Sequence, residues 1–435
     1  MASLPESNFA LNAWERELAS GTRRLHETPA GLSVSEAAAG RRRAIEARCG
    51  VSLASTGEYS MDVRTAKVEN LIGVTQIPLG VVGPLRILSD HIGENEEIFV
   101  PLATTEGALI ASTGRGCRAV RDSGGAVVHV DDVGMTRAPV FRTSGILQSL
   151  EFVAWVAAHE NEIRQICEST SRYLRLQAIR PQLVGSTVYL RFRFTCGDAM
   201  GMNMATIACA RVVEELIGPE TGVECVAVSG NYCVDKKPAA LNFIEGRGKR
   251  IYAETVLSRD VLQRCLKTTA SALCEVQYRK NQLGSIMAGA LGFNSHYANI
   301  VAAFFLATGQ DVAQVAEGAL GVTCIEPRED GAAYASVFLP DAPVAAIGGG
   351  TALSTQAEAL GLLGISTGIS TGISTGISTG ISTGNTDSTA GDAALRLAQI
   401  LGAVVLAGEI STLAALSAHH LARAHAELGR PANLS

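Results

Sequence analysis

The sequence shows no CxxC pair, no pattern typical of a secretory leader and no excess of basic residues, and each absence argues against a class of protein. Its ten cysteines are scattered, so we expect reduced, mostly buried thiols rather than a disulfide framework or a zinc site. Lysine and arginine number 36 against 42 acidic residues, a net charge of −6. This balance argues against nucleic acid as the main partner. The N-terminus shows no basic start followed by an apolar run, so it does not read as a secretory signal.

Long apolar runs are also missing. The longest candidate, residues 398–408 (AQILGAVVLAG), is followed by Glu409 and is shorter than the roughly 20 residues of a membrane span. Apolar residues nevertheless make up 47% of the 435 residues and charged residues 18%. That composition is typical of a globular protein with a large core. We therefore expect a cytoplasmic protein of two or three domains.

The order of apolar patterns predicts how these domains are arranged. Residues 126–228 give strand, helix (144–166), strand, strand (187–195, with alternating apolar residues), helix, strand, which is the ferredoxin-like or split βαβ unit. Long, weakly polar helices, one of them expected over residues 259–279, follow this segment and belong in the core of a larger domain. We expect an α+β fold in which the small domain, residues 126–228, is inserted into a large, mostly helical domain formed by residues 66–125 and 229–435.

Two segments are set apart from these domains. Residues 1–65 read as a charged helical region, in which Ser33 and Glu36 have capping-box spacing. Residues 365–384 are five copies of Ile-Ser-Thr-Gly. A four-residue period fits no helix, and a stretch of this length cannot form a solenoid core. We interpret the array as a surface loop expanded by duplication.

Three glycine-rich stretches could hold phosphates, and each has a plainer explanation. Residues 114–119 (GRGCRA) match the GxGxxA dinucleotide fingerprint. The stretch before them (ATTEGALIAST) reads as a helix rather than a strand, so we reject a Rossmann domain. Residues 197–206 (GDAMGMNMAT) and 347–351 (IGGGT) are glycine turns that can offer backbone N–H groups to a phosphate. An ordinary helix entry and a plain loop are the alternatives for these two.

Several titratable side chains are candidates for proton transfer or charge stabilisation. Glu106 lies in a small, apolar stretch, where burial would raise its pKa. A buried acid paired to a lysine is the alternative for Glu106 and also for Asp311. His296 and His425 lie on predicted helical segments, where a lone histidine is more often structural. Residues 235–237 (DKK) set an acid before two adjacent cations, an arrangement that an ordinary loop does not need.

Seven stretches, in this order, resemble the 3-hydroxy-3-methylglutaryl-coenzyme A reductases. They are ENLIGVTQIPLGVVGPL, PLATTEGALIASTGRGCRAV, GMTRAP, GDAMGMNM, SGNYCVDKKPAALNFIEGRGK, GSIMAGALGFNSHYANIVAAFFLATGQD and IGGGTALSTQ. The resemblance covers most of residues 60–430. The DKK and DAMGMNM stretches are similar to the class I branch of that family, which uses NADPH. We expect a form without the membrane anchor of its animal and fungal members.

The resemblance implies a role for each matching residue and no metal site. The catalytic group would be Glu106, Lys236, Asp311 and His425. The cofactor site would contain Ser171, Arg172, Asp198, Met200, Gly201, Met202 and Asn203, together with Gly348, Gly349 and Gly350. The site for the acyl group and coenzyme A would contain Ser112, Arg115, Arg118, Arg137, Ser229, Asn231, Asp235, Lys237, Lys280, His296 and Asn299.

Each of these residues would serve a different part of the same reaction. Lys236 would stabilise negative charge on the thioester oxygen, an effect typically worth several kcal/mol, and Asp311 would orient it. Lys237 and Arg137 would hold the substrate carboxylate. In that family the DKK loop closes an active site at a subunit interface, so the resemblance implies a homodimer or tetramer.

The activity implied is reduction of 3-hydroxy-3-methylglutaryl-coenzyme A (HMG-CoA) to mevalonate and coenzyme A with two NADPH, in isoprenoid biosynthesis. One alternative is NADH-linked oxidation of mevalonate, on which Arg172 bears as a partner for the cofactor 2′-phosphate. A second alternative is a non-catalytic coenzyme A-binding homologue, and the intact catalytic group argues against it.

The sequence departs from the family pattern at several points. Ala424 stands where many members have serine before the catalytic histidine. Gly292 and Phe293 lie in a stretch one glycine shorter than usual. Pro431 replaces the serine that kinases modify in animal enzymes, so that control should be missing. The Ile-Ser-Thr-Gly array replaces a short link between two helices.

Overall fold

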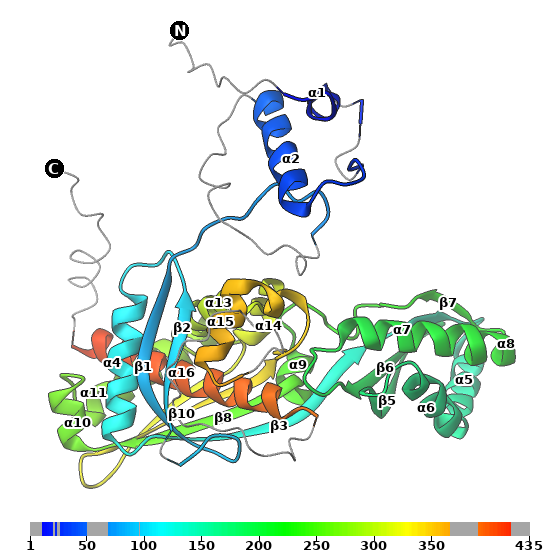
Figure 1. Ribbon diagram of the computed structural model, residues 1–435. Coiled ribbons are helices and arrows are strands. Elements are labelled where there is room, and N and C mark those ends of the chain that lie inside the picture. The colour runs from blue at the N-terminus through cyan, green and yellow to red at the C-terminus, as the bar shows by residue number, and fades with distance from the viewer. Residues whose placement is uncertain are drawn as a thin grey trace.

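The computed structural model describes residues 11–20, 22–23, 27–49, 68–94, 96–365 and 390–418. His425, Ala424, Pro431 and all of the Ile-Ser-Thr-Gly array except Ile365 lie outside the described residues. Helices and strands are combined in both main parts of the molecule (Figure 1). The predicted α+β fold class is confirmed.

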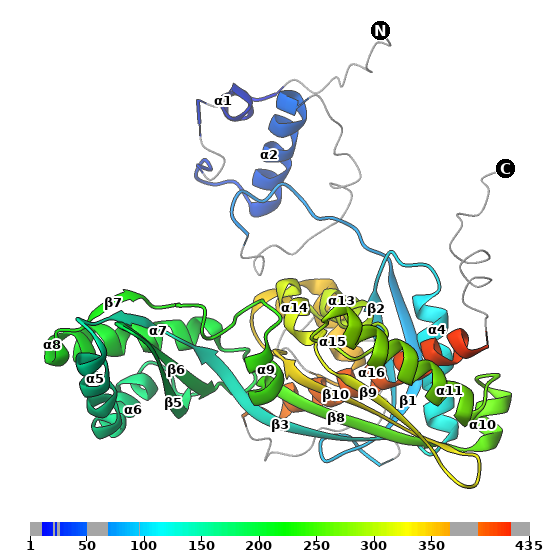
Figure 2. The ribbon, with the colours of Figure 1, turned by 180° about the vertical axis from the view of Figure 1, so that it is seen from behind.

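The N-terminal part consists of helices α1 (Ala13–Ser20) and α2 (Val34–Cys49), which pack on each other through a small apolar cluster. Figures 1 and 2 show this pair outside the main sheet. The predicted capping box is confirmed, because the Ser33 amide donates to Glu36 Oε2 at 2.8 Å and the Glu36 amide donates to Ser33 Oγ at 3.3 Å. The local sequence alone therefore sets where α2 begins.

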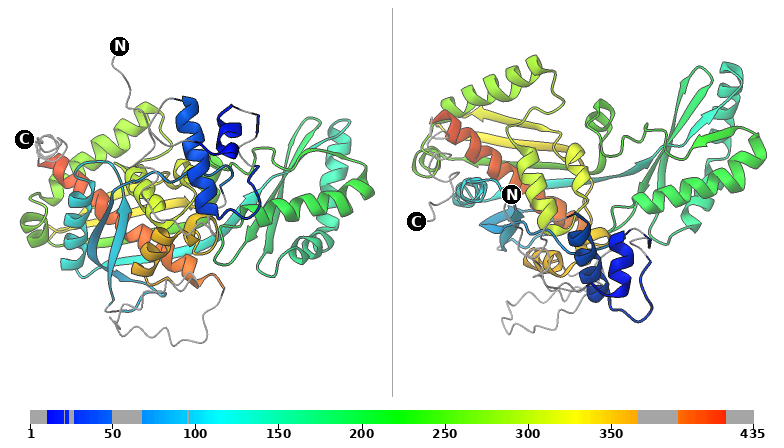
Figure 3. Two further views of the ribbon diagram at one scale, coloured as in Figure 1. Left: turned by 45° about the horizontal axis from the view of Figure 1, so that its top comes forward. Right: turned by 90° about the horizontal axis from the view of Figure 1, so that it is seen from above.

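A single path of strands runs through both main parts in the order β7-β4-β6-β3-β8-β10-β9. The strands are β1 (Leu79–Leu88), β2 (Glu97–Ala103), β3 (Ala126–Arg137), β4 (Val140–Arg142), β5 (Arg175–Val184), β6 (Thr187–Thr195), β7 (Glu224–Ala227), β8 (Arg247–Leu257), β9 (Val322–Pro327) and β10 (Ala333–Ala342). Strand β3 belongs to both parts: residues 127–134 pair with β8, and residues 135–137 pair with β6. It extends from one part into the other in Figure 3.

The smaller part has the predicted ferredoxin-like topology. Its antiparallel strands follow the order β7-β4-β6-β5, which is 4-1-3-2 within the unit. Its helices are α5 (Ile146–Ala158), α6 (Glu160–Ser169), α7 (Met202–Val212), the π-helical turn η2 (Val213–Ile217) and α8 (Gly218–Thr221). It has its own apolar core, which includes Phe141, Phe192 and Phe194. Because Val128 belongs to the other core, we propose that the small domain begins near residue 135 rather than 126.

The larger part is built around helix α16 (Asp392–Ser417), which crosses the sheet next to α4 (Leu109–Asp122). Its other helices are α9 (Ala240–Glu245), α10 (Arg259–Arg264), α11 (Ala270–Val276), η3 (Gln277–Gly284), α12 (Ser285–Ala288), α13 (Tyr297–Thr308), η4 (Val312–Gln314), α14 (Val315–Gly318), η5 (Gly349–Ala352) and α15 (Ser354–Leu362). Helices α4 and α16 approach so closely that a Cβ on Gly116 would lie 1.8 Å from the Ala407 carbonyl oxygen. Only glycine fits at that crossing.

Helix α16 is long and apolar enough to cross a membrane, and among the described residues it is the one helix that is. Of its most apolar window, 83% is buried inside the protein, as expected for a core helix. Glu409, which ends the uninterrupted apolar run in the sequence, lies within α16 and is fully buried there. Its carboxylate has hydrogen-bond partners on neighbouring segments, as described below.

Two predicted helices are each divided in the structure. The segment expected as one helix from Arg259 becomes α10 and α11, because Lys267 takes a left-handed conformation (φ 57°) and Thr269 caps a new helix by accepting from the Ala272 amide at 3.2 Å. Likewise, α5 and α6 are separate helices that meet at His159. The stretch before α4 is not helical either, so Glu106 precedes the helix instead of lying on it. Residues 114–119 lie within α4, in agreement with the rejection of a Rossmann turn.

Candidate active site

The DKK loop joins β7 to α9 and has an unusual backbone. Asn231, Val234 and Lys236 all have positive φ angles, of 63°, 51° and 59°. Non-glycine residues rarely adopt this region, and each costs roughly 1 kcal/mol or more. Such a loop persists only where its surroundings hold it.

The side chain of Lys236 leaves this loop to meet Asp311. Its Nζ lies 2.7 Å from Asp311 Oδ2, and the two side chains are 41% and 34% exposed. The other oxygen of Asp311 accepts from the Ala313 amide at 3.1 Å as the cap of η4. Asp311 is therefore oriented by the backbone that follows it, while Lys236 presents an ammonium that solvent or a ligand can reach.

Asp235 fastens the loop to β8. Its Oδ1 accepts from Arg247 Nη2 at 2.8 Å and from Gln314 Nε2 at 2.9 Å. Burial opposes its ionisation, but Arg247, Gln314 and Arg137 outweigh that effect, and the pKa of Asp235 falls below its ordinary value. Its contact with substrate stays a prediction.

The buried group beneath the loop was not predicted. Arg247 has no exposed side-chain surface and lies 2.7 Å from Glu317 Oε2. Gln314 Oε1 accepts from Arg247 Nη1 at 3.4 Å, and Asn242 Nδ2 donates to Glu317 Oε2 at 3.2 Å. No sequence signal sets Arg247 apart, because its strand also carries Lys249, Arg250 and Glu254.

Further cations lie at the edge of this loop. Lys237 is exposed, and its Nζ donates to the Asp235 carbonyl at 3.1 Å. Arg137, at the end of β3, donates from Nη1 to Ser229 Oγ at 3.0 Å. Asn231 and Ser229 are both exposed. The predicted carboxylate-binding residues Arg137 and Lys237 therefore have reachable donors on two segments that adjoin Lys236.

A second group of predicted residues surrounds the N-terminal end of α13. Asn299 Nδ2 donates to Glu106 Oε2 at 2.5 Å. The Glu106 side chain is exposed, so the expected burial of this acid is wrong for the chain on its own. Within the described residues, no hydrogen bond or ion pair joins the Glu106–Asn299 pair to the Lys236–Asp311 pair.

His296 precedes α13 as its cap residue, so its predicted place on a helix is corrected. Its Nδ1 lies 2.9 Å from Glu409 Oε1, and its Nε2 lies 2.8 Å from Thr412 Oγ1. Burial disfavours the Glu409 carboxylate, but His296, Thr323 and the Ser295 amide outweigh burial, and the pKa of Glu409 falls below its ordinary value. These contacts bind the loop before α13 to α16.

The predicted coenzyme A residues lie on α4, facing α16. Ser112 Oγ is 3.0 Å from Ser411 Oγ, and Arg115 donates to the same hydroxyl at 3.0 Å and to the Ser411 carbonyl at 2.7 Å. Burial, and then the nearby Arg118, lower the pKa of Arg115. Arg118 is exposed on the same helix, and Lys280 is exposed on η3. Arg118 and Lys280 are thus the cations of this set that are more accessible to a ligand than Arg115.

The predicted cofactor stretch lies at the start of α7. Gly201, with φ 95°, is the cap residue of this helix, and no side chain caps it. The first N–H groups of Met202 and Asn203 can therefore receive an anion such as a phosphate. Gly348 has φ 97°, with nothing within 4 Å of the place where a Cβ would stand. A parallel bridge between Ala199 and Ile347 sets the two glycine stretches side by side.

Asp198 has a structural role in this chain. Its two carboxylate oxygens accept from the Gly391 amide at 3.1 Å and from the Ala394 amide at 2.9 Å. Asp198 thus caps the beginning of α16 from a distant loop, and its contact with the cofactor stays a prediction. Its carbonyl accepts from the Ala346 and Ile347 amides at 2.9 and 3.2 Å.

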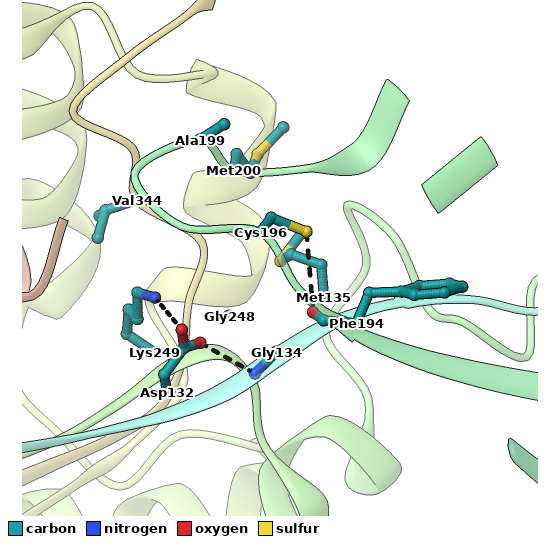
Figure 4. A pocket seen from close by; sticks show the side chains of 10 residues that line it. All are labelled: Asp132, Gly134, Met135, Phe194, Cys196, Ala199, Met200, Gly248, Lys249 and Val344. Carbon is teal, nitrogen blue, oxygen red and sulfur yellow. Dashed lines mark hydrogen bonds and ion pairs between the residues drawn. The ribbon is translucent and has the colours of Figure 1, made fainter. Parts of the chain in front are cut away.

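A small pocket opens beside this stretch, where β3, β6 and β8 meet (Figure 4). Met200 and Ala199 line one side of it, and an ion pair between Asp132 and Lys249, at 2.7 Å, lies on the other. The pocket is small for a dinucleotide but adjoins the open end of α7.

The remaining cofactor residues, Ser171 and Arg172, follow α6. Ser171 Oγ donates to Met204 Sδ at 3.4 Å, which brings it to the first turn of α7. The Arg172 guanidinium lies 4.6 Å from the centre of the Tyr173 ring and is exposed. An exposed guanidinium near an uncapped helix end is suited to a phosphate.

Proteins of one enzyme family align with nearly the whole chain. A family model described as hydroxymethylglutaryl-coenzyme A reductase matches residues 37–430. The 3-hydroxy-3-methylglutaryl-coenzyme A reductase of Methanothermobacter thermautotrophicus is 47% identical over 418 residues, which cover 95% of this chain and 98% of that relative. The enzyme of the same name from Methanocaldococcus jannaschii is 45% identical over 398 residues, covering 90% and 92%.

Solved structures show the same fold at low identity. The class II 3-hydroxy-3-methylglutaryl-CoA reductase from Streptococcus pneumoniae, bound to NADPH in open conformations, superposes with a TM-score of 0.61 and 16% identity, covering 93% of this chain and 97% of that chain. Another structure of the reductase from that organism gives 0.60 and 15%, covering 95% and 99%.

Proposed function

The chain belongs to the hydroxymethylglutaryl-coenzyme A reductase family, and we propose that it reduces HMG-CoA to mevalonate and coenzyme A with two NADPH. The first hydride converts the thioester to a hemithioacetal, which collapses to mevaldehyde and releases the coenzyme A thiol. The second hydride reduces the aldehyde to the alcohol. Each step also takes up one proton, so the balance requires two protons.

The ion pair between Lys236 and Asp311 carries this proposal. Lys236 places a cation at a partly exposed position, where it can stabilise the negative charge that develops on the thioester oxygen and then on the aldehyde oxygen. Asp311 holds that cation in place through its backbone-oriented carboxylate. Glu106, hydrogen-bonded to Asn299, is the proposed proton donor.

The substrate is held at both of its ends by cations. Arg137 and Lys237 would bind the carboxylate of the acyl group, assisted by the polar groups of Ser229 and Asn231. On α4, Arg118 would meet a phosphate of coenzyme A, with Ser112 and Arg115 in support. We also assign Lys280, His296 and Asn299 to the walls of the acyl site.

The residues around the start of α7 fit a nicotinamide dinucleotide. An uncapped helix end and the open glycines Gly348, Gly349 and Gly350 can receive its pyrophosphate. When bound, the cofactor supplies the hydride. Arg172 would bind its 2′-phosphate, which favours NADPH over NADH, and Met200 would border the neighbouring pocket.

We further propose the class I type, an assembly of at least two subunits and a cytoplasmic location. The motifs DAMGMNM and DKK support class I, and the solved structure named as class II shares only 16% identity with this chain. The Glu106 and Lys236 pairs lie in separate groups in one chain, which supports a site completed by a second subunit. His425 is the proposed acid for the departing thiolate.

The decisive experiment is a spectrophotometric assay of the purified protein. NADPH oxidation in the presence of HMG-CoA is expected, with mevalonate and free thiol as products. The assay is repeated with NADH, and in reverse with mevalonate, coenzyme A and either oxidised cofactor. Activity that depends on NADH, or only in the oxidative direction, would favour the catabolic alternative, and no activity in any assay would favour a non-catalytic homologue.

A further inference from the structure

Beneath the DKK loop lies a cluster of buried charge that the proposed reaction does not use. Arg247, Glu317 and Asp341 each have no exposed surface, and Asn242 is equally buried. Arg247 is also paired with Asp235. Three carboxyl groups therefore surround one guanidinium in the interior, an arrangement that is costly unless one carboxyl is neutral.

Glu317 connects this cluster to the catalytic loop. Its Oε2 accepts from Arg247 Nη1 at 2.7 Å and from Asn242 Nδ2 at 3.2 Å. Its Oε1 accepts the backbone N–H of Lys236. Asn242 donates in addition to the Val234 carbonyl at 3.0 Å. The two left-handed residues of the loop that are neither glycine nor asparagine are thus held from below by this cluster.

Asp341 lies next to this group but makes no contact with the loop. It stands opposite Arg247 across the β10–β8 ladder, and within the described residues neither of its oxygens accepts a hydrogen bond. Burial, followed by the nearby Glu317 carboxylate, raises the pKa of Asp341 well above its ordinary value, although Arg247 and Asn242 oppose this. Asp341 is therefore the carboxyl that favours its protonated form, and it donates that proton in a hydrogen bond to Glu317.

We propose that Glu317 is a positioning residue for Lys236: paired with Arg247, it accepts the Lys236 N–H and so fixes the origin of the catalytic side chain. A lysine has four rotatable side-chain bonds, and Asp311 holds only its tip. Holding the backbone N–H as well restricts the ammonium to the place where charge develops. This inference rests on the proposed function of Lys236.

Isosteric amide substitutions distinguish the two carboxyls. Glu317→Gln keeps an oxygen for the Lys236 amide but removes its charge, and a charged acceptor binds an N–H more strongly than a neutral one. We expect kcat to fall about tenfold or more, with the KM values for HMG-CoA and NADPH within about twofold. Asp341→Asn replaces a neutral acid with a neutral amide, which can donate to Glu317 in the same way, so kcat should remain within about twofold.

Two measurements without substrate test the same contact. Infrared difference spectra between wild type and Asp341→Asn should show one protonated buried carboxyl in the wild type at neutral pH. Hydrogen exchange of the peptide that contains Lys236 should be faster in Glu317→Gln and unchanged in Asp341→Asn. If wild type lacks reductase activity, the proposed function fails, while these two measurements still decide whether Glu317 holds the loop.

The opposite results would overturn the inference. They are a normal kcat and normal exchange in Glu317→Gln, or a loss of kcat in Asp341→Asn equal to that in Glu317→Gln. Should Glu317→Gln not fold, Glu317→Asp takes its place, because it keeps the charge but shortens the reach to the Lys236 amide. Normal kcat together with normal exchange in that variant would contradict the inference.

Discussion

The ammonium of Lys236 lies 2.7 Å from the carboxylate of Asp311, although 75 positions of sequence separate the two residues. Lys236 arrives from a loop with left-handed backbone, whereas Asp311 caps the short helix η4. An acid oriented by its own backbone thus fixes a cation that comes from a different segment. Loss of either partner should affect turnover more than binding.

The first prediction concerns Lys236. Lys236→Ala should lower kcat about 100-fold or more, because it removes the cation that stabilises the developing oxyanion. The KM for HMG-CoA should change little. Lys237→Ala is the matched control, since it removes the adjacent cation and should raise KM more than it lowers kcat. Near-normal turnover in Lys236→Ala would remove this residue from its proposed role.

The second prediction concerns the choice of cofactor. Arg172→Ala should raise the KM for NADPH about tenfold or more, because a charge-assisted contact to the 2′-phosphate is lost. The KM for NADH, which lacks this phosphate, should hardly change. Arg175→Ala serves as the control, because Arg175 is a nearby exposed arginine whose Nη1 already donates to the Leu174 carbonyl. Equal increases for both cofactors would contradict the assignment.

The third prediction concerns Asp198 as a cap of α16. Asp198→Ala should lower the free energy of unfolding by about 1–2 kcal/mol, because two amides at the helix start lose their acceptor. Chemical denaturation measures this loss. Thr355→Ala, an exposed substitution in the first turn of α15, should change stability by less than about 0.5 kcal/mol. Unchanged stability in Asp198→Ala would mean that the cap contributes nothing.

The fourth prediction concerns pH. The pKa of Glu409 is lowered from its ordinary value of 4.5, so its ionised form stabilises the fold above that value. This stabilisation is lost as pH falls from 4.5 through the lower folded pKa. Glu409→Gln should therefore cost about 3 kcal/mol at neutral pH, and the difference from wild type should shrink in acid.

Denaturant unfolding across that pH range provides the measurement. Glu358→Gln, an exposed substitution on α15, is the control and should leave the pH profile of wild type unchanged. A difference between wild type and Glu409→Gln that stays constant down to acid pH would show that ionisation of Glu409 does not contribute to stability.

The fifth prediction assigns His425 to the first reductive step only and Glu106 to both steps. His425→Gln should sharply slow reduction of HMG-CoA but largely spare reduction of free mevaldehyde, because a thiolate leaves only in the first step. Glu106→Gln should impair both reactions. Assays of both variants with both substrates decide the question, and a parallel loss of both activities in His425→Gln would contradict this division.

Local patterns predicted much of the fold. The spacing of Ser33 and Glu36 placed the start of α2, and the alternation along residues 187–195 identified β6. The small unit could be predicted because each of its elements has a clear period. The division of α10 from α11 was missed, since it depends on the left-handed backbone of Lys267 and the cap by Thr269, which apolar periodicity does not report.

The site was harder to predict wherever a side chain meets a partner distant in sequence. Asp198 and Asp235 lie in motifs typical of ligand binding, yet their carboxylates contact Gly391 and Arg247. Residue type indicates that a carboxylate is needed at such a position but does not indicate which side it faces. Glu317 and Asp341 lie in no recognisable motif, and only folding brings them beneath the catalytic loop.

The capping of α16 by Asp198 has an evolutionary consequence. A helix whose start is set by the segment just before it would be disturbed when that segment gains or loses residues. Here the first turn is held instead by Asp198, which lies in the predicted cofactor stretch. The rotational position of all 26 residues of the helix is therefore independent of how many repeat units precede it. Replication slippage in a tandem repeat can therefore change the copy number, because natural selection acts on the Asp198 contact rather than on the length of the array.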